Sequence, residues 1–276
     1  MKHACIFIIA LTLILSACGS RPASNPGPPA SAAPSPTAAA TPAPAASPTP
    51  PPSPSLPPKM KEVKKDYHMN KNYDIVPNDP NGNKKVVLLT FDDGPKDKDM
   101  NAALIKILDK HKAKAIFFLN GYRIKEKPEL VKLIHDSGQI IGNHSWDHID
   151  LKKASNEKVD EQLGEVQKIV KELTGEAPQF FRPPFGSGGD YVKSRAKAEQ
   201  MLYMTWSNGS LDWEMTNKNN DAQKVISNVL GQLHPGSNIL MHELPWTVEA
   251  LDSLLTRLAD KGYTFVDPRS IELEMR

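Results

Sequence analysis

The chain has 276 residues, of which 34 are lysine or arginine and 32 are aspartate or glutamate, so its formal net charge is +2. This balance argues against nucleic acid as a partner and against an electrostatic membrane patch, both of which need a basic surface. The two cysteines are Cys5 and Cys18. Because Cys5 lies in a segment that we expect to be removed, the mature protein has no intramolecular disulfide.

The first residues have the composition of a secretory leader. Lys2 precedes an unbroken apolar run from Ile6 to Leu15, which is shorter than the roughly 20 apolar residues that span a membrane. The run closes on LSAC at Cys18, which resembles a bacterial lipoprotein signal. We therefore expect residues 1–17 to be removed and Cys18 to carry lipid, which would anchor the protein on the extracytoplasmic face of the membrane, facing the cell wall. An ordinary leader with an incidental cysteine is the alternative.

Residues 18–58 form the next predicted region. From Arg21 to Pro58 the chain is almost entirely Pro, Ala, Ser and Thr, with Leu56 as its one large aliphatic residue. Such a segment buries too little apolar surface to fold, so we predict a disordered spacer. In extended polyproline geometry, ~38 residues reach up to roughly 120 Å. Residues 59–84 are polar and basic, and we interpret them as a lead-in with a short strand near Tyr73 to Val76.

From Val86 onward, apolar runs of strand type alternate with segments of helical spacing. The predicted strands are 86–91, 115–119, 140–141, 180–181, 202–206, 239–241 and 263–266, and the predicted helices are 101–111, 129–136, 156–173 and 248–259. This alternation predicts one α/β domain, residues 85–276, around a parallel sheet. Its length is short of the ~250 residues of a full eight-unit barrel, which favours an incomplete or distorted barrel.

The residues that could carry chemistry follow the predicted strands. Asp92 and Asp93 follow the first strand, and His144 and His148 follow the third. In a barrel of this kind the carboxyl ends of the strands converge on one mouth, so residues far apart in sequence can share a site. Later strands lead to three further groups: Arg182 and Phe185, Asp212 and Trp213, and Leu240 and His242.

Adjacent carboxylates and a histidine pair together indicate a metal site. Asp92 and Asp93 are costly to hold side by side unless a cation or a different role separates them, although a simple turn is the alternative. The spacing of His144 and His148 places both rings on one helical or turn face, and imidazole suits zinc and similar metals. That spacing is also common among surface histidines. A carboxylate with two histidines, leaving open positions for water, is however a recognised catalytic arrangement.

Together these motifs resemble the NodB-homology polysaccharide deacetylases of carbohydrate esterase family four. All five motifs of that family are present in order between Lys85 and Ser270. The resemblance implies a distorted (β/α)7 barrel with its active site at the C-terminal strand ends. It also implies a divalent metal held by Asp93, His144 and His148, with zinc as the first expectation and cobalt, manganese or nickel as alternatives.

The same resemblance assigns roles to the other motif residues. Asp92 would be the general base, positioned by Arg182, and His242 the general acid, oriented by Asp212. Such an assignment suits amide hydrolysis, because the amine leaving group needs a proton and a histidine beside a carboxylate can deliver it. Three residues would serve the substrate and its oxyanion: the backbone N–H of Phe185, and the side chains of Trp213 and Leu240 around the acetyl methyl group.

The expected reaction is removal of N-acetyl groups from an envelope polysaccharide, first of all peptidoglycan N-acetylglucosamine or N-acetylmuramic acid. Exopolysaccharide, chitin oligomers and O-acetyl xylan are alternative substrates, and a non-catalytic wall-binding module is the alternative of another class. Retention of a general base and acid argues against the last. Gly209 stands where many relatives have Asp, which leaves the sugar open. All four tryptophans lie beside motifs, as expected for a sugar ligand: Trp146, Trp206, Trp213 and Trp246. A place in the core is the alternative for Trp146 and Trp206.

Overall fold

The structure is a computed structural model that describes residues 63–276, and these residues lie in one compact unit. The predicted leader, the lipidated cysteine and the spacer lie outside the described residues. Within residues 63–276, no helix is both long enough and apolar enough to cross a membrane.

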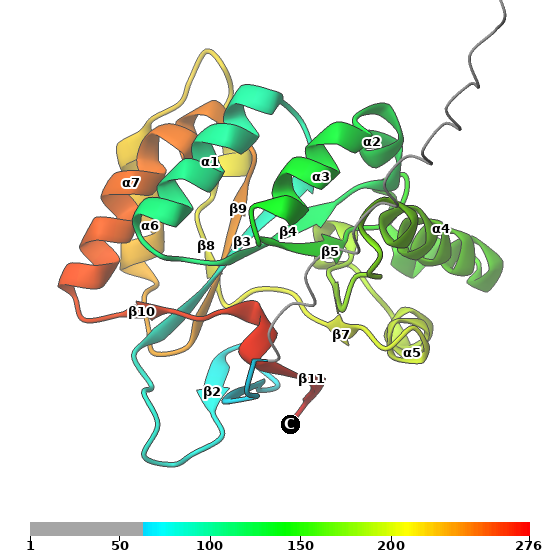
Figure 1. Cartoon of the computed structure of the whole chain (residues 1–276), viewed down its shortest axis with the longest axis horizontal. Coiled ribbons are helices and arrows are strands. Elements are labelled where there is room, and N and C mark those ends of the chain that lie inside the picture. Colours follow the sequence, from blue (N-terminus) through cyan, green and yellow to red (C-terminus); the bar gives the residue numbers. More distant parts are fainter. Residues whose placement is uncertain (1–62) are drawn as a thin grey trace, which may run out of the picture. The chain divides into compact units, whose positions relative to one another are not determined.

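A curled parallel sheet forms the centre of the molecule (Figure 1). Its strand order is β7-β6-β5-β4-β3-β9-β8, and β10 pairs with the beginning of β3. The strands are β3 (Val86–Gly94), β4 (Ala115–Leu119), β5 (Ile140–Asn143), β6 (Phe180–Phe181), β7 (Leu202–Tyr203), β8 (Asn208–Gly209), β9 (Ser237–His242) and β10 (Thr264–Phe265). The curled sheet is a half-barrel with helices outside, so the expected α/β fold, a distorted (β/α)7 barrel, is confirmed.

Helices lie on the outer face of this sheet (Figure 1). They are α1 (Lys98–Lys110), α2 (Gly121–Glu126), α3 (Pro128–Asp136), α4 (Asn156–Thr174), α5 (Asp190–Ala198), α6 (Ala222–Gly231) and α7 (Pro245–Asp260). Four 3-10 turns join them: η1 (Leu151–Lys153), η2 (Pro184–Gly186), η3 (Asp212–Glu214) and η4 (Pro268–Ser270). Apolar side chains from α1, α3, α4, α6 and α7 pack with the sheet in the largest core cluster, which is the burial that stabilises amphipathic helices.

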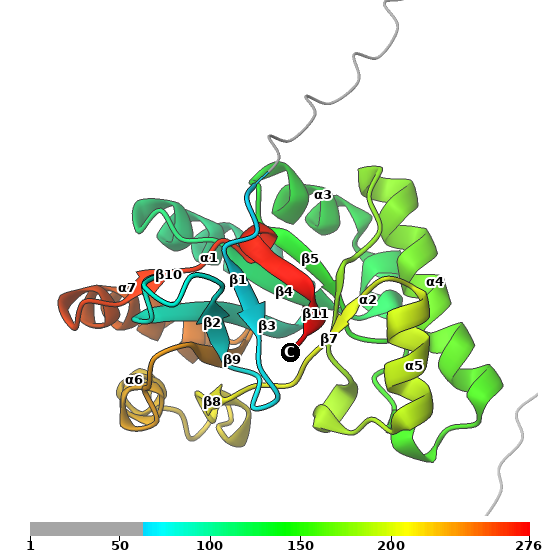
Figure 2. The same ribbon diagram turned by 90° about the horizontal axis from the view of Figure 1, so that it is seen from below.

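A second, smaller sheet closes the lower end of the barrel (Figure 2). It contains β1 (Tyr67–Met69), β2 (Ile75–Pro77) and β11 (Ile271–Met275), in the order β11-β1-β2. Met69, Ile75 and Ile271 are buried in a cluster with Val86 and Leu88 at the start of β3. The segment that we interpreted as a lead-in therefore supplies two strands to the folded unit, and the strand predicted there is β2.

The predicted elements correspond to observed ones, with shifts at their ends. The clearest difference is β7, which ends at Tyr203 although the apolar pattern continues to Trp206. The chain leaves the sheet there because the Thr205 carbonyl accepts hydrogen bonds from Arg182 Nε and Nη2, at 3.1 and 2.8 Å. A side chain from another strand thus replaces the backbone pairing that the sequence pattern suggested.

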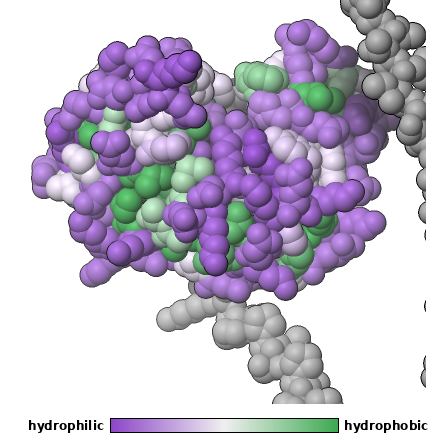
Figure 3. Space-filling view, turned by 90° about the horizontal axis from the view of Figure 1, so that it is seen from above, coloured by the Kyte–Doolittle hydropathy of each residue, from purple (hydrophilic) through white to green (hydrophobic). Residues whose placement is uncertain are grey.

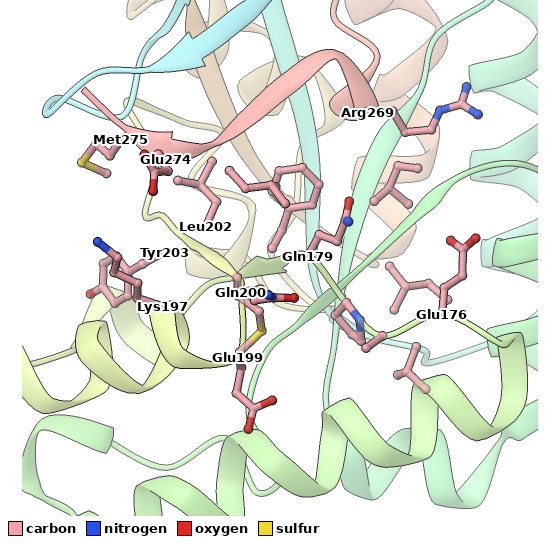
Figure 4. Close-up of a pocket in the computed structure, with 18 of the residues that line it drawn as sticks. Glu176, Gln179, Lys197, Glu199, Gln200, Leu202, Tyr203, Arg269, Glu274 and Met275 are labelled. Atoms are coloured by element: carbon pink, nitrogen blue, oxygen red, sulfur yellow. The ribbon is translucent and has the colours of Figure 1, made fainter. Parts of the chain in front are cut away.

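A groove of about 1330 Å³ lies at the amino ends of β5, β6 and β7 (Figure 4). Gln179, Lys197, Glu199 and Tyr203 are among the side chains that line it. None of the motif residues does. Volume alone would therefore place the site at the end of the barrel opposite to the one that the chemistry indicates.

Candidate active site

The motif residues meet at the carboxyl ends of the strands, as the sequence predicted. β3 and β9 are adjacent and parallel, and their register pairs Asp92 with His242 and Thr90 with Leu240. The proposed base and acid, 150 positions apart in the chain, are thus neighbours across two strands. They are neighbours because all strands of a parallel sheet end at the same edge, so that their last residues lie close together.

Asp93, His144 and His148 form the one group of metal-ligating side chains found among the described residues, with ligand atoms all within 4.8 Å of one another. Asp93 Oδ1 lies 3.4 Å from His144 Nε2 and 3.1 Å from His148 Nε2. This oxygen is buried and has no hydrogen-bond partner that satisfies normal geometry. A buried oxygen facing two imidazole nitrogens fits a divalent cation.

The charge state of Asp93 suits that role. Burial by itself would raise the pKa of the Asp93 carboxyl, but its interactions with His144 and His148 outweigh burial and hold the pKa well below its ordinary value. The carboxylate is therefore available as an ionised ligand throughout the physiological range.

The backbone aims His144 and His148 at Asp93. The predicted spacing allowed a helix or a turn, and the structure shows a turn: Ser145 and His148 have φ of 66° and 55°, the left-handed region. His144 Nδ1 donates to the carbonyl of Arg182 at 2.7 Å. That bond fixes the tautomer and leaves Nε2 free to bind a metal, which is how a second hydrogen bond orients a ligating histidine.

Arg182 and Asp92 form a buried ion pair beside this group. Arg182 is 0% exposed, and its Nη1 donates to Asp92 Oδ1 at 2.7 Å. Its remaining donors bond Thr90 Oγ1 at 2.8 Å, the Thr205 carbonyl, and Asn238 Oδ1 at 3.2 Å. A buried guanidinium is tolerable only when its donors are satisfied in this way. The pair fixes the orientation of Asp92, whose other oxygen, Oδ2, lies 3.7 Å from His144 Nε2.

His242 and Asp212 form a second charged pair. His242 Nδ1 lies 2.8 Å from Asp212 Oδ1, and the backbone N–H of His242 donates to Asp212 Oδ2 at 2.7 Å. Burial would lower the pKa of the His242 imidazole, but the hydrogen bond and charge of Asp212 outweigh it, so the pKa is raised above its ordinary value. A protonated imidazole at this position can act as an acid.

Aromatic side chains surround the mouth of the site. Phe185 and Trp213 are 67% and 39% exposed, whereas Leu240 is 3% exposed. The rings of Trp213 and His242 lie 5.4 Å apart, and those of Phe185 and His148 4.7 Å apart. The view from above shows hydrophobic patches set among hydrophilic surface (Figure 3). Exposed aromatic faces beside a polar site are suited to the C–H faces of sugars.

Gly209 lies directly under this mouth. A Cβ atom there would lie 3.1 Å from Trp213 Cη2 and 3.7 Å from Trp206 Nε1, tighter than ordinary contact to the first ring. An Asp side chain at this position would therefore have to displace Trp213. The departure noted in the sequence thus bears on the pocket wall.

The structure adds supporting contacts that the sequence analysis did not indicate. Thr247 Oγ1 donates to Asp212 Oδ2 at 2.6 Å, and Trp246 Nε1 donates to the Asp212 carbonyl at 2.9 Å. Trp246 is 5% exposed, so it holds Asp212 in place and is not an exposed sugar platform. Thr90 and Asn238 support Arg182 in the same way. Nothing in the sequence indicated these supporting roles beyond the position of each residue in a strand or at the start of a helix, because contacts between elements leave no local sequence pattern.

A carboxylate bonded by an arginine, a histidine bonded to an aspartate and an Asp-His-His group lie together at one strand-end rim, which is the set of groups that a metal-assisted hydrolase needs. The sequence profile of the polysaccharide deacetylase family matches residues 79–206. The chain belongs to this family, carbohydrate esterase family four. The family and the Asp-His-His group together indicate a divalent metal.

The chain is similar to two named bacterial deacetylases and to one solved structure. The chain is 36% identical over 189 residues to a peptidoglycan-N-acetylglucosamine deacetylase of Bacillus cereus, covering 67% of each chain. It is 33% identical over 200 residues to PdaA, a peptidoglycan-N-acetylmuramic acid deacetylase of Bacillus subtilis, covering 71% of this chain and 75% of that one. A family-four pseudoenzyme from Bacillus anthracis superposes with a TM-score of 0.63 at 34% identity, over 66% of this chain and 63% of that one. The chain thus spans less than two thirds of the pseudoenzyme's length.

Proposed function

We propose that this chain hydrolyses N-acetyl groups of peptidoglycan, at N-acetylglucosamine or N-acetylmuramic acid. The observation that carries the proposal is that two adjacent carboxylates have different main partners. Asp92 is paired with Arg182, while Asp93 faces His144 and His148. The names of the two Bacillus relatives supply the substrate class.

The residues divide the reaction between them. Asp93, His144 and His148 would hold a divalent metal, which we propose to be zinc; bound there, it would polarise the acetyl carbonyl and lower the pKa of water. Asp92, oriented by its hydrogen bond from Arg182, accepts the proton of the attacking water.

The remaining groups act on the tetrahedral intermediate. The backbone N–H of Phe185 donates to the developing oxyanion, and such donors typically contribute about 10²–10³ in rate. His242, charged and oriented by Asp212, donates a proton to the amine nitrogen as the C–N bond breaks. Trp213 and Leu240 enclose the acetyl methyl group.

A non-catalytic wall-binding module is the second candidate, and the likeness to a pseudoenzyme is the observation that favours it. Against it stands the condition of the two pairs. Asp92 and His242 each keep the partner that sets orientation and charge, and binding a glycan requires neither. The catalytic proposal therefore uses more of what the site contains.

We also propose the location. A lipoprotein leader ending at Cys18, lipid on that cysteine and a spacer over residues 18–58 would hold the domain outside the membrane within reach of the wall. The two relatives that act on peptidoglycan are in keeping with an extracytoplasmic site of action.

Acetate release from a panel of purified glycans tests the reaction and its substrate. We expect release from peptidoglycan, less from chitin oligomers and O-acetyl xylan, and release slower by ~10²–10⁴-fold from the Asp92→Asn variant. Release from no glycan by the metal-loaded protein, with peptidoglycan binding retained, would establish the binding module instead. Preference for chitin oligomers over peptidoglycan would overturn the substrate but keep the reaction.

A further inference from the structure

Lys96 lies in the turn that follows β3 and faces a metal ligand. Its Nζ is 3.9 Å from Asp93 Oδ2, and the two side chains are only 18% and 27% exposed. The other oxygen of the same carboxylate, Oδ1, faces His144 and His148. Asp93 thus presents one oxygen to the metal position and the other to an ammonium group.

The backbone of Lys96 is clamped from both sides. Its N–H donates to Glu243 Oε2 at 2.8 Å, and Lys127 Nζ donates to its carbonyl. Glu243 is 0% exposed and also accepts from Asn101 Nδ2 at 3.0 Å. These bonds tie the turn to β9 and α1, so Lys96 is held beside Asp93 by the protein interior.

Glycine is required for this arrangement. A Cβ atom on Gly94 would lie 2.0 Å from Glu243 Oε1 and 2.8 Å from Leu119 Cδ2. The buried carboxyl of Glu243 therefore packs directly against the residue that follows Asp93. Glu243 therefore contacts both the end of β3, which carries Asp93, and the following segment, which carries Lys96.

We propose that Lys96 is a tuning residue, which lowers the affinity of the Asp93-His144-His148 site for its divalent metal through its positive charge. The inference rests on the metal site of the proposed function. At 3.9 Å the ammonium is too far from Oδ2 for a hydrogen bond. It therefore acts through charge, and a charge in a half-buried position is only partly screened by solvent.

The sign of the effect follows from this. A positive charge beside the site repels a divalent cation and competes for the electron density of the shared carboxylate. The bound metal is then held less tightly and remains more electrophilic than the three ligands alone would make it. An outer partner that donated a true hydrogen bond would instead orient the ligand and raise affinity.

Metal affinity of three variants tests the proposal. Lys96→Met removes the charge with little change in shape, Lys96→Arg keeps it, and Lys98→Met removes an equal charge from an exposed position two residues along. Zn²⁺ affinity of the metal-free protein is measured by competition with a chromophoric chelator. We expect Lys96→Met to bind Zn²⁺ about tenfold more tightly, and the other two to stay within about twofold of the parent.

Unchanged or weaker affinity in Lys96→Met would overturn the proposal, as would equal tightening in Lys98→Met. Lys96→Gln, a second neutral variant, should tighten binding in the same direction, and thermal unfolding of each apoprotein checks that the fold is intact. The assignment of the metal site has a separate test: if it is wrong, His148→Ala binds Zn²⁺ with the affinity of the parent. If His148→Ala loses the metal but Lys96→Met binds Zn²⁺ with the affinity of the parent, the tuning role alone is contradicted.

Discussion

Asp92 and Asp93 are consecutive residues of β3 whose surroundings differ, so their substitution should have different effects. Asp92 bonds Arg182 at 2.7 Å and is 3% exposed. We expect Asp92→Asn to lower the rate by ~10²–10⁴-fold, the usual cost of a lost base, while metal content stays at the parent value. Acetate release and metal analysis of the same preparation measure both. Metal loss from Asp92→Asn would show that Asp92 is a ligand.

His242 should be separable from the metal site in another way. We expect His242→Ala to lose ~10²–10⁴-fold on an N-acetyl substrate and much less on an activated acetyl ester, whose leaving group needs little protonation. The ratio of the two rates in variant and parent is the measurement. Equal losses on both substrates would exclude a role for His242 as proton donor.

The raised pKa of His242 predicts a pH dependence with a definite sign. As an acid the imidazole works when protonated, so activity falls as pH rises through its pKa, and Asp212 moves that fall to higher pH. Asp212→Asn should move the alkaline limb of kcat/KM to lower pH. Thr247→Val, which removes a hydrogen bond at 2.6 Å but keeps the carboxylate charge, should shift it less. An alkaline limb that stays in place in Asp212→Asn would contradict the assignment.

Among the elements, the small sheet has the clearest consequence for stability. Ile75 in β2 is 2% exposed, and its N–H donates to the Gly236 carbonyl at 2.8 Å. We expect Ile75→Ala to cost about 2–5 kcal/mol in the free energy of unfolding, against less than about 0.5 kcal/mol for Lys71→Ala on the exposed turn nearby. Denaturant unfolding of both variants gives the comparison.

The same sheet predicts where the chain can be shortened. A fragment that begins at Lys59 keeps β1 and β2 and should retain full activity on a soluble substrate. One that begins at Lys85 loses both strands and uncovers Val86 and Leu88, each at most 1% exposed. It should unfold at a lower temperature or fail to fold. Equal melting temperatures for the two fragments would show that the small sheet is dispensable.

The elements also show how far sequence alone reached. β4 was predicted at its observed limits, because five consecutive apolar residues between turns leave little choice. Helix α5 was not predicted, since only Val192 and Ala196 are buried in it and its apolar face is weak. β1 and β11 were missed for a different reason. Three- and five-residue strands more than 200 positions apart pair with each other, and no local window contains that partnership.

The site was more predictable than the fold around it. The types and spacing of Asp93, His144 and His148 indicated a metal group, which the structure brings together, and the family resemblance implied the pairing of Asp92 with Arg182. The residues that hold them were not indicated. Thr247, Asn238 and Glu243 act through contacts between elements, and many other residue types occur at such helix starts and strand positions without that role.

At the scale of the whole molecule, attachment and catalysis should be independent. Cys18→Ala should release the protein from the membrane fraction and leave the rate on soluble glycan fragments unchanged, because the groups to which we assign catalysis all lie between Asp92 and His242. Fractionation of cells expressing each form, followed by an acetate assay, tests this. Continued membrane association of Cys18→Ala would count against lipidation at that residue.

The placement of β1 has a geometric consequence for a tethered enzyme. β1 lies in the small sheet at the lower end of the barrel, whereas Asp92 and His242 lie at the carboxyl ends of β3 and β9. A chain segment that precedes β1 therefore joins the domain at the end opposite Asp92 and His242. The lipid anchor that we propose at Cys18 would thus be joined to the domain at the end away from the site and would leave the site accessible to glycan.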